Sequence, residues 1–457
     1  MRLGHVTDLH ARTHMPGVAP KPGRLSRDIP DRLAQCLARM TELGCDAVAV
    51  TGDLLDVPTF LYDPVPGFKP DEPAFWAERA EMDYRLIRGV LEAAGLPFFV
   101  LPGNHDFEPA MWRVFNPEAN EHEISGVRII RFCDREHHIG ASGHTPRRFY
   151  PERDRWLEAL ADATTPQVHL QHYVIAPTIG HRYPHNYAEH EEMTRRISAA
   201  PHVRLCLSGH DHNPPPPEVH GSTLFAVTPS FCEHPHRFRV FDVKPGAPVT
   251  WEDHALAEKR AVRPCVFLDR DGVLNHDASF WFGPDRFELL PGVGPAVRRL
   301  NEAGFATVVQ TRQSCVGTGF APYEVVRHVH DKMHRLLGAD DARLDAVYFS
   351  MGGGDDAVLP MYRDVSDAKP SPKLLVKAAS ELGLDLGASW MVGDSTRDIE
   401  AGARAGCRTV LVRTGDGPRH EAEVRERFPE SAIVADLPAA VGHILSAAPG
   451  VLPTSPS

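Results

Sequence analysis

Aspartate, asparagine and histidine residues follow short apolar runs at five places in the first half of the chain. These places hold Asp8 and His10, Asp53, Asn104 and His105, His172, and His210 and His212. In the first and last groups the two side chains stand two residues apart, so they point to the same side of a strand and can bind one ion together. Oxygen and imidazole ligands suit Mn²⁺, Fe²⁺, Ni²⁺ or Zn²⁺, and the sequence does not choose among them. The first half therefore predicts a metal site.

A second set of residues, in the second half of the chain, suits phosphoryl transfer through an aspartate. Asp269 and Asp271 follow the apolar run Cys265 to Leu268, which places both carboxylates on one face at the end of a buried strand. One carboxylate can attack phosphorus while the other moves the proton of the leaving group. A hydroxyl, an ammonium and two more carboxylates follow at Thr311, Lys369, Asp394 and Asp398. These groups can anchor phosphate, neutralise charge and ligate Mg²⁺.

The elements that position both sets are short apolar runs alternating with helical patterns, which is typical of layered α/β architecture. In the first half the predicted strands are Leu3 to Thr7, Ala47 to Thr51, Phe98 to Leu101, Val168 to Gln171 and Val203 to Leu207. In the second half they are Cys265 to Leu268, Ala306 to Gln310, Ala346 to Phe349, Trp390 to Val392 and Thr409 to Val412. Helical patterns between the second-half strands imply right-handed crossovers and a mostly parallel sheet.

Length and composition indicate a two-domain protein of the ordinary soluble class. The chain has 457 residues, more than one core usually serves, and we expect domains at 1–258 and 262–447 with a flexible tail at 448–457. A net charge of -12 argues against a general nucleic-acid binder. The start MRLGHVTDLH lacks the apolar run of a secretion signal and no apolar stretch is long enough to cross a bilayer, so a cytoplasmic location without a membrane partner is expected.

The first set of motifs, D-x-H, G-D, G-N-H-D, H and G-H-x-H in this order, resembles the calcineurin-like metallophosphoesterase family. The resemblance implies a β-sandwich flanked by helices and in-line attack of a metal-activated water on phosphorus. It assigns one ion to Asp8, His10 and His212, and a second ion to Asn104, His172 and His210. Asp53 would bridge the two ions. Asn104 and His105 would contact the phosphate, and His105 would assist the leaving group.

The second set resembles the haloacid dehalogenase (HAD) superfamily, across nearly all of the second half. The resemblance implies a Rossmann-like parallel sheet with a small cap or none, and a bound Mg²⁺. It makes Asp269 the nucleophile and a metal ligand, Asp271 the general acid/base with its carbonyl on the metal, and Asp394 a further metal ligand. Thr311, Arg312 and Lys369 would bind phosphate.

The motifs LDRDGVLN, ELLPGV and TRQSCVGTGF resemble the small-capped branch that includes histidinol-phosphate and heptose-bisphosphate phosphatases. The chain departs from that branch at two places. That branch usually has T-N-Q where this chain has Thr311-Arg312-Gln313, so a longer cation replaces an amide beside the phosphate. Arg312 could recognise a second anionic group or could impair the site. The branch often carries a Cys/His zinc loop, whereas Phe349 to Ala368 contains neither residue type, so we expect no zinc there.

Two features of the first half allow more than one interpretation. The aromatic-rich stretch between Val57 and Tyr84 could stack a base over the metals or could form a small satellite core. His181, His185 and His190 follow His172 and could line its pocket or lie on the surface.

Together the two sets predict a bifunctional phosphate-ester hydrolase that acts in sequence. The first domain would open a phosphodiester and the second would remove the monoester that remains. The acidic net charge favours a nucleotide-type or sugar-phosphate small molecule as substrate. One alternative is a nucleic-acid end-processing enzyme, a nuclease joined to a 3′-phosphatase. Another is one active hydrolase joined to a regulatory phosphate-binding domain, and the oligomeric state is left open.

Overall fold

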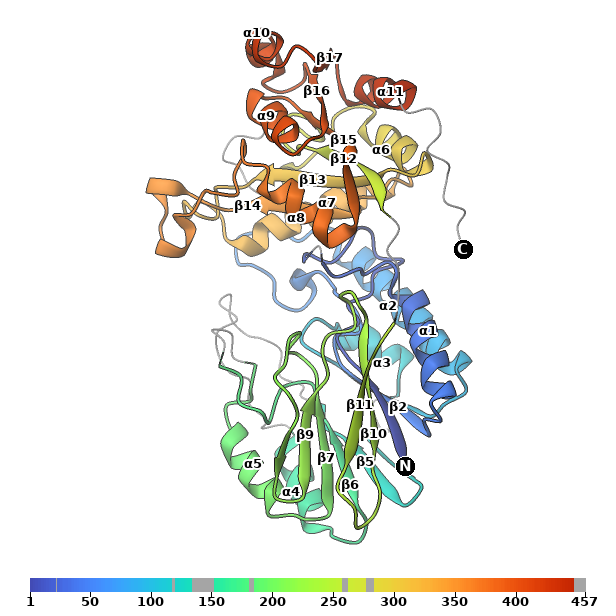
Figure 1. Ribbon diagram of the computed structural model, residues 1–457. Coiled ribbons are helices and arrows are strands. Elements are labelled where there is room, and N and C mark those ends of the chain that lie inside the picture. Colours follow the sequence, from blue (N-terminus) through green and yellow to red (C-terminus); the bar gives the residue numbers. More distant parts are fainter. Residues whose placement is uncertain are drawn as a thin grey trace. The chain divides into compact units, whose positions relative to one another are not determined.

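The computed structural model divides the chain into two units, each with its own hydrophobic core (Figure 1). It describes residues 1–21, 23–116, 120–133, 152–180, 185–256, 262–276 and 283–447. Unit 1 comprises Met1–Met15, Arg24–Pro64 and Glu72–Glu258, and unit 2 comprises Pro16–Gly23, Val65–Asp71 and Lys259–Ser457. The expected tail at 448–457, His181 and most of the expected boundary region fall outside the described residues.

Unit 1 contains two mixed β-sheets. The first has the order β11-β10-β1-β2-β3, with strands Thr250–Ala255, Arg237–Asp242, Arg2–Val6, Ala47–Thr51 and Phe98–Leu101. The second has the order β4-β5-β6-β7-β9-β8, with strands Glu121–Ile124, Val127–Arg131, Gln167–Leu170, Val203–Ser208, Thr223–Val227 and Glu218–His220. The strands with predicted ligands at their ends pair in parallel. These are β1, β2 and β3 in the first sheet, and β6 and β7 in the second.

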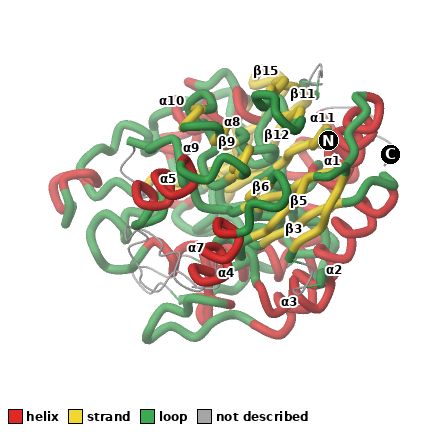
Figure 2. Tube along the Cα trace, turned by 90° about the horizontal axis from the view of Figure 1, so that it is seen from below, coloured by secondary structure: helices red, strands yellow, loops and turns green. Residues whose placement is uncertain are grey.

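The two sheets of unit 1 pack face to face. One buried cluster joins Leu3 and Phe99 of the first sheet to Val168 and Leu205 of the second, as in a β-sandwich. Helices cover the two outer faces: α1 (Ile29–Glu42), α2 (Pro73–Ala93) and α3 (Glu108–Val114) on the first sheet, α4 (Arg153–Ala161) and α5 (His190–Ser198) on the second. Figure 2 shows α2 and α3 along one side of the strands. The predicted α/β sandwich flanked by helices is therefore confirmed.

The buried aromatic residues of the stretch after Asp53 belong to this first core. Phe60, in a 3₁₀ turn (Thr59–Leu61), and Trp76, in α2, are buried in the cluster under the first sheet. Their faces are therefore not available to stack a base, and they are part of the main core of unit 1 instead of a satellite of their own.

Unit 2 is built on one fully parallel sheet. Its order is β14-β13-β12-β15-β16-β17, with strands Ala346–Ser350, Ala306–Arg312, Arg263–Leu268, Leu384–Gly393, Arg408–Val412 and Ala432–Val434. The strands are joined by α6 (Val293–Glu302), α7 (Tyr323–Gly338), α8 (Lys373–Leu382), α9 (Thr396–Arg404) and α10 (Gly417–Arg427), and α11 (Leu437–Ala447) follows β17. The chain order reverses direction at β12, which lies between β13 and β15. Ligands of open α/β sheets bind at such a reversal, outside the carboxyl ends of the strands.

Two short segments from early in the chain complete unit 2. Val65–Asp71 places the Asp71 carboxylate against the Arg335 guanidinium of α7, with Nε to Oδ2 at 2.6 Å and Nη2 to Oδ1 at 2.7 Å. Pro16–Gly23 lies on the same helix, where His334 leaves no room for a side chain on Gly17. Both contacts involve α7. Among the described helices of either unit, none combines the length and apolar character needed to span a membrane.

Candidate active sites

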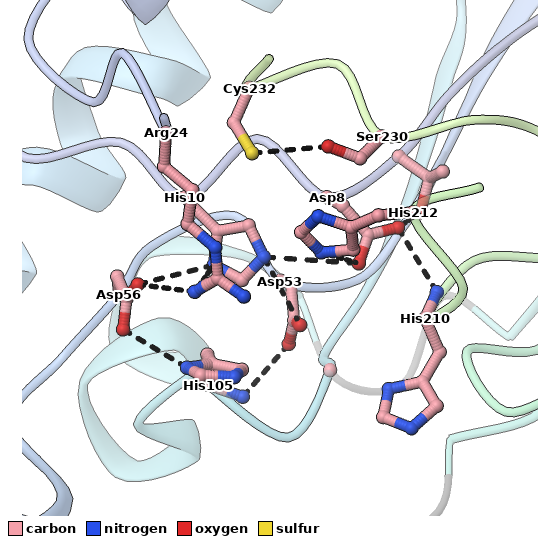
Figure 3. Close-up of polar contacts among 12 residues, drawn as sticks. Asp8, His10, Arg24, Asp53, Asp56, His105, His210, His212, Ser230 and Cys232 are labelled. Carbon is pink, nitrogen blue, oxygen red and sulfur yellow. Dashed lines mark hydrogen bonds and ion pairs between the residues drawn. The ribbon is translucent and has the colours of Figure 1, made fainter. Parts of the chain in front are cut away.

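The predicted ligands of unit 1 converge at loops that leave the carboxyl ends of β1, β2, β3, β6 and β7 (Figure 3). Four of them, Asp8, His10, Asp53 and His210, have positive φ angles of 55°, 46°, 50° and 71°. Residues other than glycine rarely adopt this conformation, because the Cβ crowds the backbone, and each instance is strained. The chain therefore holds strained backbone at the positions that aim these carboxylates and imidazoles inward.

Asp53 lies between two groups of donors. Its Oδ2 is 3.5 Å from His10 Nε2 on one side and 3.5 Å from His172 Nε2 on the other. Two donors that bind one ion at about 2.1 Å stand roughly 3 Å apart, so these spacings suit one carboxylate oxygen shared by two ions. Asp53 also accepts a 2.8 Å hydrogen bond from the His105 backbone N–H through its other oxygen.

The remaining predicted ligands surround these two positions. His212 Nε2 lies 3.6 Å from Asp8 Oδ1, beside His10. On the other side, His172 Nδ1 is 2.8 Å from the Thr51 carbonyl, which turns its Nε2 toward Asn104 Oδ1 at 3.1 Å. Asp8, His10 and His212 form one group of close donors, and Asp53, His172 and His210 form another.

Two buried donor atoms of this site suit coordination by divalent cations. Asp8 Oδ1 and His10 Nε2 are buried and make no hydrogen bond within the described part of the chain. Burial, and then the charges of Asp8 and Asp106, raise the pKa of Asp53 well above its usual range. Buried carboxylates and orphaned imidazole nitrogens are costly unless a positive charge sits among them. The residues present therefore fit a pair of divalent ions.

Asp56, absent from the predicted set, supports His105. Its Oδ1 lies 3.0 Å from His105 Nδ1, and its Oδ2 accepts a 2.5 Å bond from the buried Arg24 guanidinium. Burial opposes ionisation of Asp56, but the charges of His105 and Arg24 outweigh it and hold the pKa of that carboxyl well below its usual range. The His105 ring is thereby fixed by one edge. The spacing G-D-L-L-D in the sequence was the signal that could have identified Asp56.

Glu233 supports a second imidazole in the same way, and it too was missed. Its Oε1 lies 2.8 Å from His212 Nδ1, which directs His212 Nε2 toward Asp8. A carboxylate on the outer nitrogen of a ligating histidine fixes the ring and strengthens its donor. Of the ambiguous histidines, His185 lies with its ring centre 5.1 Å from that of His210, whereas His190 begins α5.

In unit 2 the predicted nucleophile is paired with the predicted lysine. Lys369 Nζ lies 2.7 Å from Asp269 Oδ2 and 2.5 Å from Asp398 Oδ1, and all three side chains are nearly buried. Burial raises the pKa of Asp269 to about 7, although Lys369 opposes the shift. Burial works against the Lys369 ammonium, but Asp269 and Asp398 outweigh it and raise the pKa of that ammonium.

Asp394 completes an acidic pocket next to Asp269. Asp269, Asp394 and Asp398 form one group of close carboxylates, and burial and then Asp398 raise the pKa of Asp394 to about 6. Gly272 and Gly415 face the Asp394 carboxylate so closely that a Cβ on either would collide with it. Hard oxygen donors crowded in this way fit a small cation such as Mg²⁺, which would offset their shared charge.

Asp271 stands at the same strand end, held by three donors. The Arg270 guanidinium binds both of its oxygens, Asn275 Nδ2 donates to Oδ1 at 2.9 Å, and Gln313 Nε2 donates to Oδ2 at 3.0 Å. Burial opposes its ionisation, but Arg270 and the two amides lower the pKa of Asp271. The carboxylate thus points into the site in a fixed position.

These residues line one cavity of about 360 Å³ at the carboxyl end of the sheet. Thr311, Arg312 and Lys369 all reach it, and so do Arg397 at the start of α9 and His420 of α10, which the sequence motifs did not identify. The structure therefore brings together the predicted second-half residues, as it does those of the first half.

Comparisons with known proteins agree with this division. Residues 1–214 match the family described as calcineurin-like phosphoesterases, and residues 367–440 match the family described as HAD-hydrolase-like. The D-glycero-D-manno-heptose-1,7-bisphosphate 7-phosphatase of Thermosynechococcus vestitus is 39% identical over 187 residues, which are 40% of this chain and 95% of the relative.

Two solved structures are similar to one half each. The D,D-heptose 1,7-bisphosphate phosphatase of B. bronchiseptica, complexed with magnesium and phosphate, is 33% identical and covers 40% of this chain and 99% of its own, with a TM-score of 0.37. A dimetal phosphatase from Danio rerio is 13% identical and covers 56% of this chain and 97% of its own, with a TM-score of 0.44. From the matched families and the relative, this chain joins a calcineurin-like phosphoesterase to a phosphatase of the haloacid dehalogenase superfamily, and both of its halves belong to families of phosphate-ester hydrolases.

Proposed function

We propose that both units are active, unit 1 as a phosphodiesterase with two divalent ions and unit 2 as a magnesium-dependent phosphomonoesterase. One observation carries the proposal: each unit has its own complete set of reacting groups at its own strand ends. Asp53 Oδ2 is equidistant from His10 and His172 in unit 1, and Asp269 contacts Lys369 in unit 2. Neither set borrows a residue from the other unit.

In unit 1 the chain's own residues bind ions and handle the leaving group. Two ions among Mn²⁺, Fe²⁺, Ni²⁺ and Zn²⁺ would supply positive charge for the phosphoryl oxygens and lower the pKa of a water. Asp53 would hold both ions, and Asn104 and His105 would contact the phosphate. Asp56 contacts His105 Nδ1 at 3.0 Å and fixes that edge of the ring, so His105 would give a proton to the departing oxygen through its opposite edge.

In unit 2 the reaction proceeds through Asp269. Its carboxylate attacks phosphorus, the bond from phosphorus to the ester oxygen breaks, and Asp271 passes to that oxygen the proton brought by the monoanionic ester. Water then attacks the phosphorus of the phosphoaspartate and gives its proton to Asp271, while the bond from phosphorus to the Asp269 carboxylate oxygen breaks and phosphate leaves with that proton. Lys369 and Thr311 hold the phosphoryl oxygens, and Mg²⁺ held by Asp269, Asp394 and the Asp271 carbonyl would neutralise their charge.

The substrate we propose for unit 2 is a small molecule with a second anionic group. Arg312 and Arg397 line the cavity, are exposed, and form no ion pair with any residue that the structure describes. Two unpaired guanidiniums beside a phosphate-ester site favour an added phosphate or carboxylate. The relatives' printed names, which are those of bisphosphate phosphatases, support the same class.

Two matched substitutions test the two-enzyme proposal. Asp53→Asn should lower hydrolysis of bis(p-nitrophenyl) phosphate by about 10³-fold or more and leave monoester hydrolysis intact, because it removes the shared ligand. Asp269→Asn should do the reverse with p-nitrophenyl phosphate, because it removes the nucleophile. Monoester hydrolysis that survives in Asp269→Asn would refute the assignment of unit 2. A panel of sugar bisphosphates, nucleotides and phosphate-ended oligonucleotides would then rank substrate classes.

A further inference from the structure

The guanidinium that holds Asp271 has another contact on its far side. Arg270 Nη1 lies 3.3 Å from Nε2 of His330, in the middle of α7. Both side chains are buried, with Arg270 4% and His330 7% exposed. The contact therefore joins the predicted acid/base of unit 2 to a histidine that belongs to none of the motifs.

The chemistry of arginine decides how this contact is made. A guanidinium has only N–H donors, so His330 must accept through a lone pair on Nε2 and carry its proton on Nδ1. Burial, and then the charge of Arg270, hold the pKa of His330 well below its usual range, so the ring stays neutral and able to accept. One donor of Arg270 is thus directed at His330 while two others are directed at Asp271.

The His330 ring packs against an aromatic ring on one side and borders a small cavity on another. Its centre lies 5.1 Å from that of Phe349, edge to face, at the end of β14. On another side it lines a small cavity of about 20 Å³, together with His334 and the backbone segment Val18 to Pro20. This space has room for one water. The Phe349 contact therefore restricts the His330 ring on one side.

We propose that His330 is a positioning residue for the second site: it fixes the Arg270 guanidinium, which in turn fixes the Asp271 carboxylate in line with the leaving group. The inference rests on the proposed function of unit 2, with Asp271 as acid/base. Without an acceptor at residue 330, one donor of the buried guanidinium loses its partner, and Arg270 must tilt to find another. Because the other two nitrogens of the same guanidinium bind Asp271, the Asp271 carboxylate moves with Arg270.

The effect falls on one step of the reaction. While the Asp269 carboxylate bonds to phosphorus and the ester bond breaks, Asp271 must reach the departing oxygen with a proton. An alkyl phosphate needs this proton because an alkoxide is a poor leaving group, whereas 2,4-dinitrophenolate leaves without one. The value of kcat/KM reports this first half of the reaction. Loss of position at Asp271 therefore lowers kcat/KM for the alkyl ester selectively.

The experiment compares full-length variants on glycerol 3-phosphate and 2,4-dinitrophenyl phosphate. Asp271→Asn is the reference variant, and it should lower kcat/KM for the alkyl ester by about 10²-fold or more. His330→Leu should lower kcat/KM for the alkyl ester about tenfold and that for the dinitrophenyl ester less than about twofold. His330→Gln should recover most of the loss, because its side-chain carbonyl can accept from Arg270.

His328→Leu is the matched control, since His328 is also buried on α7 but lies two residues earlier and thus on another side of the helix. It should change both substrates by the same small factor. Equal losses on both substrates in His330→Leu, or no loss, would overturn the positioning role. If Asp271→Asn lowers kcat/KM equally for both esters, Asp271 is not the acid/base, and both the proposed function of Asp271 and this inference are wrong.

A second measurement does not depend on turnover. In ¹⁵N-histidine-labelled full chain, the resonances of His330, assigned by their loss in His330→Gln, should show a neutral ring protonated on Nδ1. A ring protonated on Nε2 cannot accept from Arg270 and would overturn the proposal even if activity changed.

Discussion

The two sites differ in where their positive charge comes from. In unit 2 the chain supplies a cation of its own, because Lys369 lies between Asp269 and Asp398 at 2.7 and 2.5 Å. In unit 1 the buried Arg24 guanidinium contacts Asp56 and the outer nitrogen of His10, and Asp8 Oδ1 is left without a hydrogen bond among the described residues. The first site is therefore organised around charges that only bound ions can bring.

The two units also differ in how they fix the side chains of their sites. Unit 1 fixes its ligands through backbone, with positive φ angles at Asp8, His10, Asp53 and His210. Unit 2 fixes its carboxylates through side-chain pairs and the capping box in which the Asp398 carboxylate accepts from Ser395 at the start of α9. We therefore expect the geometry of unit 2 to depend on Lys369 and that of unit 1 to depend on metal.

Loss of Lys369 should give the largest effect. Lys369→Met leaves two buried carboxylates without their counter-charge and should destabilise unit 2 by about 3–5 kcal/mol in buffer without divalent ions. The pKa of Asp269 is already raised to about 7, so protonation at lower pH relieves the repulsion and the loss should grow as pH rises from 6 to 8. Hydrogen exchange of peptides from β12 and β15 during denaturant unfolding would assign the change to unit 2.

Lys377→Met is the control, because Lys377 is exposed and its contact with Glu381 is long at 3.8 Å. It should change stability by less than about 0.5 kcal/mol. If Lys369→Met lowers the free energy of unfolding by a similarly small amount that does not change with pH, unit 2 does not depend on its internal cation. The contrast between the two sites would then be wrong.

Removal of Glu233 should weaken metal binding in unit 1 by a smaller amount. Without its 2.8 Å partner the His212 ring is free to turn, so Glu233→Ala should lower Mn²⁺ affinity about 10- to 100-fold, or roughly 1.4–2.8 kcal/mol. Isothermal titration of the chelated chain with Mn²⁺ measures the change. Glu218→Ala, which removes a similar carboxylate from exposed His220, should leave the affinity unchanged. Equal titrations in both variants would show that His212 is held without Glu233.

Much of this fold could be predicted because each strand that leads into a site is an apolar run followed by a polar residue. The strands Ala47–Thr51 and Phe98–Leu101 occur as predicted. The strand expected at Trp390 to Val392 is longer, Leu384–Gly393, because exposed residues such as Asp385 extend it along β12 past an irregularity in the register. The long helix α2 was missed because its buried aromatic residues suggested an insertion.

The reacting groups were easier to predict than the residues that support them. Asp8, Asp53 and Asp269 follow apolar runs and have glycine neighbours or repeated spacing, which local sequence records. Glu233 and His330 are defined by partners 21 and 60 residues away, His212 and Arg270, and no local pattern marks such pairs. The two segments that join unit 2 from early in the chain were hidden for the same reason.

The smallest predicted effect concerns one of those segments, Val65–Asp71. It tests how much this early segment stabilises unit 2. Asp71, 7% exposed in its side chain, binds Arg335 through two hydrogen bonds. A double-mutant cycle of Asp71→Ala and Arg335→Ala should give a coupling of about 1 kcal/mol, at the upper end for ion pairs because the geometry is bidentate and half-buried. The cycle of Arg298→Ala and Glu302→Ala, an exposed pair at 3.5 Å on α6, should give about 0.3 kcal/mol. If the two couplings are equal, the contact between Asp71 and Arg335 stabilises unit 2 no more than an exposed ion pair on one helix does.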